Sequence, residues 1–589
     1  MIRSGLRLAL LPCLALSLTA SAPGADLAAR RKALDGLLKE QWEYTLRTSP
    51  EYASILGDKR WNDKLTDFSQ AGIDADLRQN AEFLKRFEAI DPTGFPDQER
   101  LNRDLMVRQL RIALDGARFK EWEMPLLQNS GIHIDLPQFV AMMPFETVKD
   151  YEDYAARLRQ VPRVFEETVQ QMRNGMKDGL MPPAFLLPKI ADQCDKLLAT
   201  PAEADPFLQP LAKFPATFTE ADKTRLRTTI TEAVKTQVRP AYTRLAAFVR
   251  TEYAPKGRTK EGLGSLPGGQ AFYAYKVKAS TTTDLSPEAI HELGLREVAR
   301  IEGEMLAVAR QLGYPDLKAF NAAIHANPAL HPKSRQEILD LYTKVTDQMY
   351  AKLPQLFGRL PKAKVVVRPV EAFREKEASA AAYIPGSPDG ARPGSVLVNT
   401  GDFASRLTLG IETTALHEGV PGHHMQLAIA QELPELPPFR QQGNFTAYVE
   451  GWALYAERLG RQVGFFQEPH SFYGHLQDEM LRAIRLVVDT GLHAKGWSRQ
   501  QVVDFFHAHS GIEEVEVQSE TDRYIAWPGQ ALGYKVGQLK ILELRAYAEA
   551  QLGKRFDLRA FHDEVLGGGA LPLDILEARI KAWVARTKA

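Results

Sequence analysis

The sequence HEGVPGHH, residues 417–424, holds two candidate zinc ligands and a candidate general base within eight positions. In the common H-E-x-x-H arrangement, two histidines four residues apart on one helix bind a single Zn²⁺, and the glutamate activates a water molecule. Here the fourth residue after His417 is Pro421, so the usual second histidine is absent. The candidate partners of His417 are therefore His423 and His424, and Glu418 is the candidate general base.

An unbroken helix would not let either partner share an ion with His417. Six residues turn a helix by about 600°, which leaves His423 roughly 120° off the face of His417 and about 9 Å along the axis. His424 would lie about 10.5 Å away, whereas Zn–N bonds are about 2.0–2.1 Å long. Proline lacks an N–H and crowds the preceding turn, and glycine adopts angles closed to other residues. We expect Pro421-Gly422 to break the helix so that His417 and His423 converge; the alternative is a helix end with surface histidines.

A third ligand is needed, because a catalytic zinc usually has three protein ligands and one position for water. Glu450 is the best candidate, since an acid is unexpected in the apolar, aromatic helix predicted for residues 446–457 unless it is paired or ligated. Gly451 would permit close approach to the helix of His417. Glu457 lies on nearly the same face two turns later, and we expect it to orient a ligand histidine. The alternative for both acids is an ordinary surface or ion-paired glutamate.

Other polar residues could stabilise the oxyanion that forms when a carbonyl is attacked. Arg485, Asp489 and His493 follow at i, i+4 and i+8, a spacing that allows a linked polar row on one helix face. That row could be a structural ion network, or it could bring His493 to the cleft as an oxyanion donor.

Two tyrosines and an arginine follow further along the chain. Tyr524 and Tyr534 are candidate oxyanion donors, although buried tyrosines are often core residues whose hydroxyl has found a partner. Arg523 could bind a substrate carboxylate through two parallel hydrogen bonds.

Composition narrows the class of protein. The 589 residues include 44% apolar and 25% charged residues, which is ordinary for a soluble globular protein. Lys plus Arg and Asp plus Glu both total 74, so no net charge attracts nucleic acid or an anionic membrane. We expect neither partner.

Residues 1–25 have the layout of a secretory signal peptide, with Arg3 and Arg7 before a short apolar run and small residues after it. The run is too short to span a membrane. Cys13 has a poor context for a lipoprotein. We expect a periplasmic or secreted protein with no stable membrane insertion after cleavage, and with Cys194 as its one cysteine, hence no internal disulfide.

Helical periodicity dominates the mature chain, and three short strands are predicted at 365–367, 381–384 and 395–399, just before the histidine motif. The edge of such a sheet could pair with an extended peptide; the alternative is a purely structural sheet. We predict one catalytic domain over 26–589, with an N-terminal helical lobe at about 26–260 and a metal-site lobe at about 261–589.

Several strings together resemble the bacterial DUF885 family, whose members look like zincin-type metallopeptidases. They are residues 417–423 with Gln426, residues 450–457, residues 487–493, and Arg523-Tyr524 with residues 527–531. The resemblance implies a mainly α, zincin-like fold with a small sheet beside the active-site helix and two lobes around a channel. It also implies that His417, His423 and Glu450 are ligands and that Glu418 is the base. Candidates for contacts to the ligands or the substrate are Glu457, Asp489, Arg523, His424 and Gln426.

The predicted function is hydrolysis of short peptides with one Zn²⁺. Glu418 would take a proton from water and return it to the leaving amine. Two alternatives stay open: a zinc-dependent hydrolase of a non-peptide amide or ester, and a zinc-fold binding protein without turnover. The sequence leaves open exo- against endopeptidase action, side-chain preference and oligomeric state.

Overall fold

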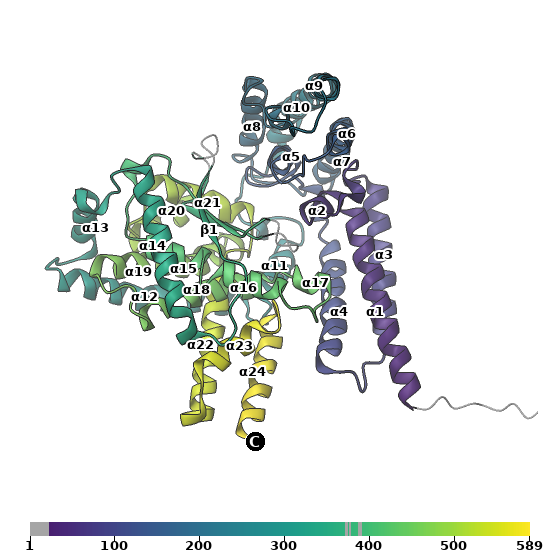
Figure 1. Cartoon of the computed structure of the whole chain (residues 1–589). Coiled ribbons are helices and arrows are strands. Elements are labelled where there is room, and N and C mark those ends of the chain that lie inside the picture. Colours follow the sequence, from purple (N-terminus) through teal and green to yellow (C-terminus); the bar gives the residue numbers. More distant parts are fainter. Residues whose placement is uncertain (1–22, 371–374, 376–377, 387–391) are drawn as a thin grey trace, which may run out of the picture.

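A computed structural model of the protein describes residues 23–370, 375, 378–386 and 392–589. The predicted signal segment up to residue 22, with Cys13, lies outside the described residues. Helices make up most of the described chain and a three-stranded sheet accompanies them (Figure 1), which confirms the predicted mainly α class. None of the described helices has the length and apolar character needed to cross a bilayer.

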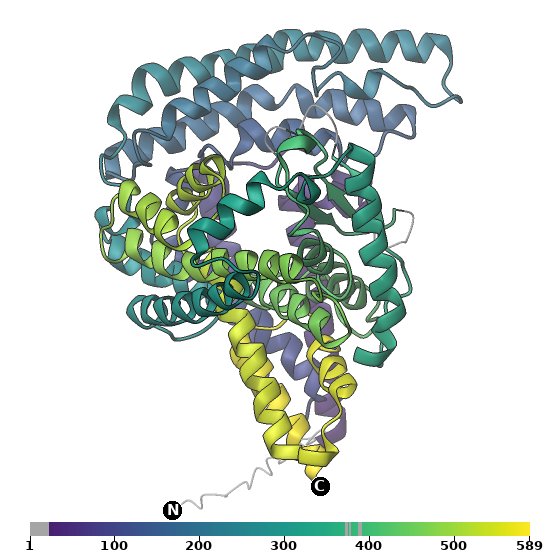
Figure 2. The same ribbon diagram turned by 90° about the vertical axis from the view of Figure 1, so that its left-hand side faces the viewer.

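The regular secondary structure in the first part of the chain is helical. Its α-helices are α1 (Pro23–Thr48), α2 (Pro50–Ile55), α3 (Gln70–Glu88), α4 (Asp97–Ala117), α5 (Ile132–Val140), α6 (Val148–Leu158), α7 (Val161–Asp178), α8 (Leu187–Ala199), α9 (Glu220–Ala233) and α10 (Arg239–Phe248). Helices α1, α3 and α4 share a small core around Phe83 and Phe87. Helices α5 to α10 enclose a separate core around Phe165 and Tyr242, and they lie as a blue layer across the top of Figure 2.

The second part carries the sheet and the candidate site. Its α-helices are α11 (Gly269–Thr281), α12 (Pro287–Gln311), α13 (Leu317–Ala326), α14 (Arg335–Leu356), α15 (Ile411–Glu418), α16 (His423–Gln431), α17 (Pro438–Gln441), α18 (Thr446–Gln462), α19 (Pro469–His493), α20 (Arg499–His509), α21 (Glu514–Ala526), α22 (Leu532–Leu552), α23 (Leu558–Leu566) and α24 (Leu573–Lys588). Its largest core surrounds Trp452 and also includes Leu105 of α4. Since a helix of the first part contributes to this core, the division into two lobes around a channel stays a prediction.

Helix α12 illustrates how the sequence pattern sets the packing. The Ser286 side chain caps its first turn by accepting from the N–H of Ala289. The apolar stripe of Ile290, Val298 and Ile301 is buried, and the helix packs along α19. Helix α19 is buried over most of its surface, and it packs against α12, α22 and α15, the helix that carries His417.

The sheet consists of β1 (Val366–Pro369), β2 (Ala381–Ile384) and β3 (Ser395–Val398), which agree with the predicted strands. Their order is β1-β3-β2, with β1 parallel and β2 antiparallel to β3. Strand β2 is therefore an edge strand of this sheet, and it contacts α15.

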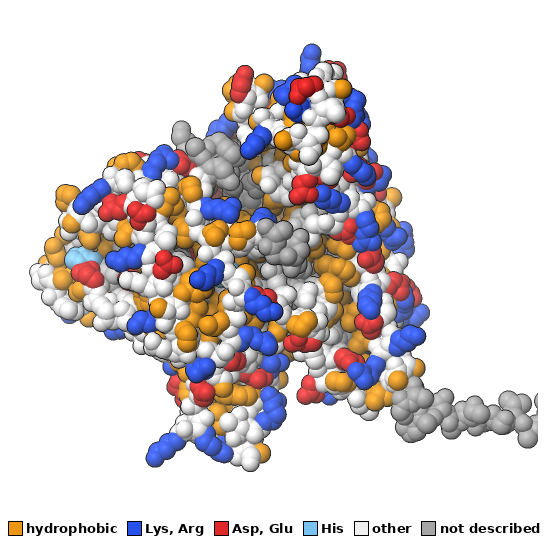
Figure 3. Space-filling view, in the orientation of Figure 1, with side chains coloured by type: hydrophobic (Ala, Val, Ile, Leu, Met, Phe, Trp, Pro, Cys, Tyr) orange, Lys and Arg blue, Asp and Glu red, His pale blue; other side chains and the backbone are white. Residues whose placement is uncertain are grey.

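Acidic and basic side chains are interspersed on the face of the molecule shown in Figure 3, so neither positive nor negative charge dominates that face.

Candidate metal centre

The helix that carries His417 breaks where the sequence predicts a break. Helix α15 ends at Glu418, α16 begins at His423, and the Val420–Pro421 peptide bond between them is cis. The imidazole rings of His417 and His423 consequently lie with their centroids 4.7 Å apart. An unbroken helix would hold their Cα atoms about 9 Å apart along its axis.

Close packing defines the geometry of the break. A Cβ atom at Gly422 would lie 1.9 Å from the carbonyl oxygen of His417, so a residue with a side chain does not fit there. The indole Nε1–H of Trp452 in α18 donates to the carbonyl of Pro421 at 2.9 Å. The break is therefore tied directly to the helix that supplies the third candidate ligand.

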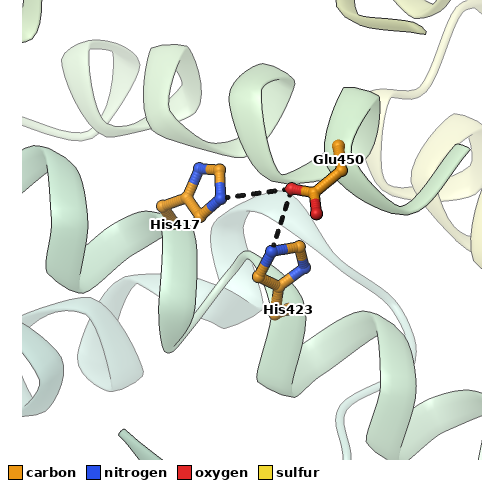
Figure 4. Close-up of side chains that lie close together, drawn as sticks. All are labelled: His417, His423 and Glu450. Carbon is orange, nitrogen blue, oxygen red and sulfur yellow. Dashed lines mark ion pairs between the residues drawn. The ribbon is translucent and has the colours of Figure 1, made fainter. Parts of the chain in front are cut away.

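His417, His423 and Glu450 converge on one point (Figure 4). Oε2 of Glu450 lies 3.6 Å from Nε2 of His417 and 3.3 Å from Nε2 of His423. A distance of 3.6 Å is too long for a good hydrogen bond. Zn–N and Zn–O bonds of about 2.0–2.1 Å place the ligand atoms of a tetrahedral ion about 3.3–3.4 Å apart, close to both distances. The three residues thus form a group that could hold a metal ion, and their roles as ligands stay predictions.

Glu457 lies directly behind His417. The Nδ1–H of His417 donates to Oε1 of Glu457 at 2.8 Å, the contact expected of an orienting carboxylate. Burial lowers the pKa of His417, but the neighbouring carboxylates of Glu450 and Glu457 outweigh burial and raise the pKa to about 10. Burial acts to raise the pKa of Glu450, whereas His423 and His417 hold it well below its usual range.

Glu418 is half-buried and meets the free edge of the sheet. Its Oε2 accepts the backbone N–H of Tyr383 in β2 at 2.8 Å. The candidate base therefore lies beside both His417 and the edge strand.

His424 points to the sheet instead of toward Glu450. Its Nε2–H donates to the carbonyl of Ala363 and its Nδ1 accepts the hydroxyl of Tyr383, both at 3.0 Å. Its role is to tie α16 to the sheet. The buried Gln426 side chain has no hydrogen-bond partner within the described part of the chain.

The expectation that His493 could donate to an oxyanion is contradicted by its hydrogen bonds. Its Nδ1 accepts the backbone N–H of Leu263 at 2.8 Å, and its Nε2–H donates to the carbonyl of Tyr524 at 2.9 Å. Both ring nitrogens are used in binding the backbone of distant segments. His493 is therefore a buried structural residue.

Asp489 also binds neighbouring segments instead of its predicted row partners Arg485 and His493. It accepts the Tyr273 hydroxyl at 2.6 Å and the N–H of Gly529 at 3.0 Å. Burial raises the pKa of Asp489 to about 7 against these two hydrogen bonds. The predicted linked row is absent from the described structure, because Arg485 and His493 each bind Tyr524 of α21, whereas Asp489 binds Tyr273 and Gly529.

The hydroxyl groups of Tyr524 and Tyr534 differ in their hydrogen bonds. Tyr524 donates to Glu520 and accepts from Nε of Arg485 at 2.9 Å, so its hydroxyl is committed to a buried ionic network. Tyr534 accepts from Nη2 of Arg523 at 3.4 Å, and no described residue accepts the Tyr534 proton. Tyr534 therefore remains a candidate donor. Arg523 itself is partly engaged by Glu520 at 3.2 Å.

Gly451 faces a different helix from the one predicted. A Cβ atom at Gly451 would lie 2.5 Å from the Cα atom of Gly537 in α22, so the close approach is between α18 and α22 and not toward α15. The paired glycines set the position of the backbone that carries Glu450.

Sequence reasoning missed His475 of α19. Its Nδ1 lies 3.6 Å from Oε2 of Glu457, and the ring is buried. A histidine inside a helix that is apolar on most sides is a weak signal, and no spacing relates it to the other site residues.

Comparison with known proteins places the chain in a family. Residues 50–580 match the family described as "Bacterial protein of unknown function (DUF885)". The chain belongs to the DUF885 family. No curated protein matches it.

Two solved structures share the fold of this DUF885 protein. A candidate lipoprotein from Colwellia psychrerythraea is 28% identical, with 95% of this chain and 100% of that chain covered and a TM-score of 0.89. A candidate lipoprotein of unknown function from Shewanella oneidensis is 18% identical, with 93% and 99% covered and a TM-score of 0.69. A candidate oligoendopeptidase F is 13% identical, with 87% and 96% covered, but its TM-score of 0.33 is too low to support an argument.

Proposed function

We propose that this DUF885 protein is an exported zinc-dependent peptidase with a zincin-like fold, acting on short peptides in a channel between two lobes. The convergence of His417, His423 and Glu450, with Glu418 at a free sheet edge beside them, carries the proposal. The description of two structural relatives as candidate lipoproteins supports export.

The donor set suits one zinc ion with an open position for water. Bound by these three residues, Zn²⁺ would polarise the scissile carbonyl and make water more acidic. Glu457 keeps a proton of His417 on Nδ1, so that Nε2 is the ring nitrogen that would face the ion.

Glu418 would move the proton. It accepts a proton from the attacking water and delivers it to the leaving amine. Its hydrogen bond to the N–H of Tyr383 holds the carboxylate at the sheet edge before substrate arrives. The hydroxyl of Tyr534 would donate to the developing oxyanion, because Arg523 leaves that proton unused.

The edge strand supports a peptide as the substrate. Ala381 and Tyr383 occupy alternate positions of β2, and the N–H of Tyr383 points away from β3 toward Glu418. An extended peptide could pair with the outward main-chain groups of this edge that Glu418 does not use, and so present one bond to Glu418. A non-peptide amide or ester would lack most of these hydrogen bonds.

The test combines metal analysis of the purified protein with digestion of short peptides by the wild type, Glu418→Gln and the control Glu435→Gln, whose residue is exposed. We expect one zinc per chain in all three, and a loss of cleavage on the order of 10²–10⁴-fold in Glu418→Gln alone. Absence of zinc in the wild type would overturn the metal assignment. Undiminished cleavage by Glu418→Gln would overturn the role of the base, and cleavage of an ester or amide panel without peptides would change the substrate class.

A further inference from the structure

A second histidine stands behind the carboxylate that orients His417. Oε1 of Glu457 accepts from His417, and Oε2 of the same carboxylate lies 3.6 Å from Nδ1 of His475. Glu457 lies between the two imidazoles and is fully buried. The three side chains come from α15, α18 and α19, so they connect three helices around the site.

The facing atoms of Glu457 and His475 are both unpaired. Oε2 of Glu457 and Nδ1 of His475 are buried and have no hydrogen-bond partner among the described residues. Leaving a buried polar atom unpaired costs about 1–3 kcal/mol, and more for a charged group. A side-chain shift of about 0.5 Å would bring the two atoms to an ordinary N–H···O distance.

The surroundings hold the His475 ring in place. It stacks on Phe466 with centroids 4.8 Å apart and an interplanar angle of 24°. The backbone N–H of Phe466 donates to Glu412 of α15 at 2.9 Å. The ring is therefore fixed relative to the same helix that carries His417.

A second acidic side chain, Glu479, lies one turn later in α19. Its Oε1 accepts from Lys535 at 2.6 Å and from Arg300 at 2.8 Å, whereas its Oε2 has no hydrogen-bond partner among the described residues. Burial lowers the pKa of His475, so the ring is neutral and has one N–H to donate. Placing that proton on Nδ1 pairs it with Glu457.

We propose that His475 is a positioning residue for the metal centre: it donates Nδ1–H to Glu457, which keeps the other carboxylate oxygen on His417 and so aims Nε2 of His417 at the ion. This inference rests on the proposed function, because it presumes that His417 binds a metal. It adds a second residue, reached through Glu457, to the support of that ligand.

Three substitutions separate hydrogen bonding from ring packing. In His475→Asn the side-chain amide nitrogen can take the place of Nδ1, whereas in His475→Gln it reaches the place of Nε2. His475→Phe keeps a ring that can stack on Phe466 but has no hydrogen-bond donor. Zinc affinity of the full chain is measured by competition with a chelator, with His291→Asn, a buried histidine bonded to Thr490, as the control.

We expect His475→Gln and His475→Phe to bind zinc at least about tenfold more weakly than the wild type, which is the lower end of the effect of residues that orient a metal ligand. The zinc affinity of His475→Asn should stay within about threefold of the wild-type value. Retained affinity in His475→Phe, or equal losses in Asn and Gln, would show that packing alone matters and would overturn the inference.

A second measurement needs no zinc and no altered fold. Histidine-selective ¹⁵N NMR of the metal-free protein, assigned with His475→Asn, reports which ring nitrogen carries the proton. We expect Nδ1–H. Zinc binding together with an Nε2–H tautomer would overturn the inference alone, whereas a wild type that binds no zinc would overturn the proposed function and the role of His475 toward a metal with it.

Discussion

The contact between Gly451 and Gly537 predicts that Gly451→Ala weakens zinc binding. The new Cβ atom would lie 2.5 Å from the Cα atom of Gly537, whereas carbon atoms need about 3.5–4.0 Å. Helices α18 and α22 must therefore separate by about 1 Å or more, since the opposing atoms are backbone. Glu450 is the adjacent residue, and metal–ligand distances tolerate only about 0.2 Å. We expect at least a tenfold loss of zinc affinity and a loss of about 1–3 kcal/mol in the free energy of unfolding.

Chelator competition and denaturant unfolding measure the two effects. The control is Gly303→Ala in α12, where a Cβ atom would meet nothing within 4 Å. This control should gain about 0.5–1 kcal/mol, because alanine is favoured over glycine inside a helix, and should bind zinc as the wild type does. If Gly451→Ala also keeps the wild-type zinc affinity and stability, the glycine contact does not set the position of Glu450 and the reasoning is refuted.

Three further predictions concern single side chains. The pKa of Asp489 is raised to about 7, so the folded state holds the Asp489 proton more tightly than the unfolded state does. The free energy of unfolding should therefore fall as pH rises from about 4 to 7, by up to roughly 1.4 kcal/mol per pH unit. In urea unfolding at pH 5 and pH 8, Asp489→Asn should lack this pH dependence of stability. If the wild type and the variant lose stability equally between the two pH values, the raised pKa of Asp489 is contradicted. Tyr534→Phe should keep zinc and stability but lose about 10²–10³-fold in kcat, whereas Tyr524→Phe should lose about 1.5–3 kcal/mol of stability; equal kcat losses in both would refute the distinction. Trp452→Phe leaves the carbonyl of Pro421 without its donor, so zinc affinity should fall together with about 1–3 kcal/mol of stability, and a variant with unchanged zinc affinity would show that this bond does not hold the break.

Local chemistry made part of the site predictable. A proline followed by a glycine ends a helix because one lacks an N–H and the other fits where a Cβ would collide, so the break after Glu418 follows from Pro421-Gly422. Short apolar runs near Pro and Gly, with β-branched and aromatic residues among them, likewise predicted the strands. The seven-residue spacing of Glu450 and Glu457 predicted that both acids lie on one face of a helix.

The sequence by itself thus determined the mainly helical class, the sheet before the histidine motif and the break that brings His417 and His423 together, because each depends on residues close in the chain. Only the tertiary structure decided that Gly451 meets α22, that His493 is used by Leu263 and Tyr524, and that His475 faces Glu457. Helical periodicity shows which residues share a face. It does not show which distant helix that face will meet, and buried polar groups take their roles from that neighbour.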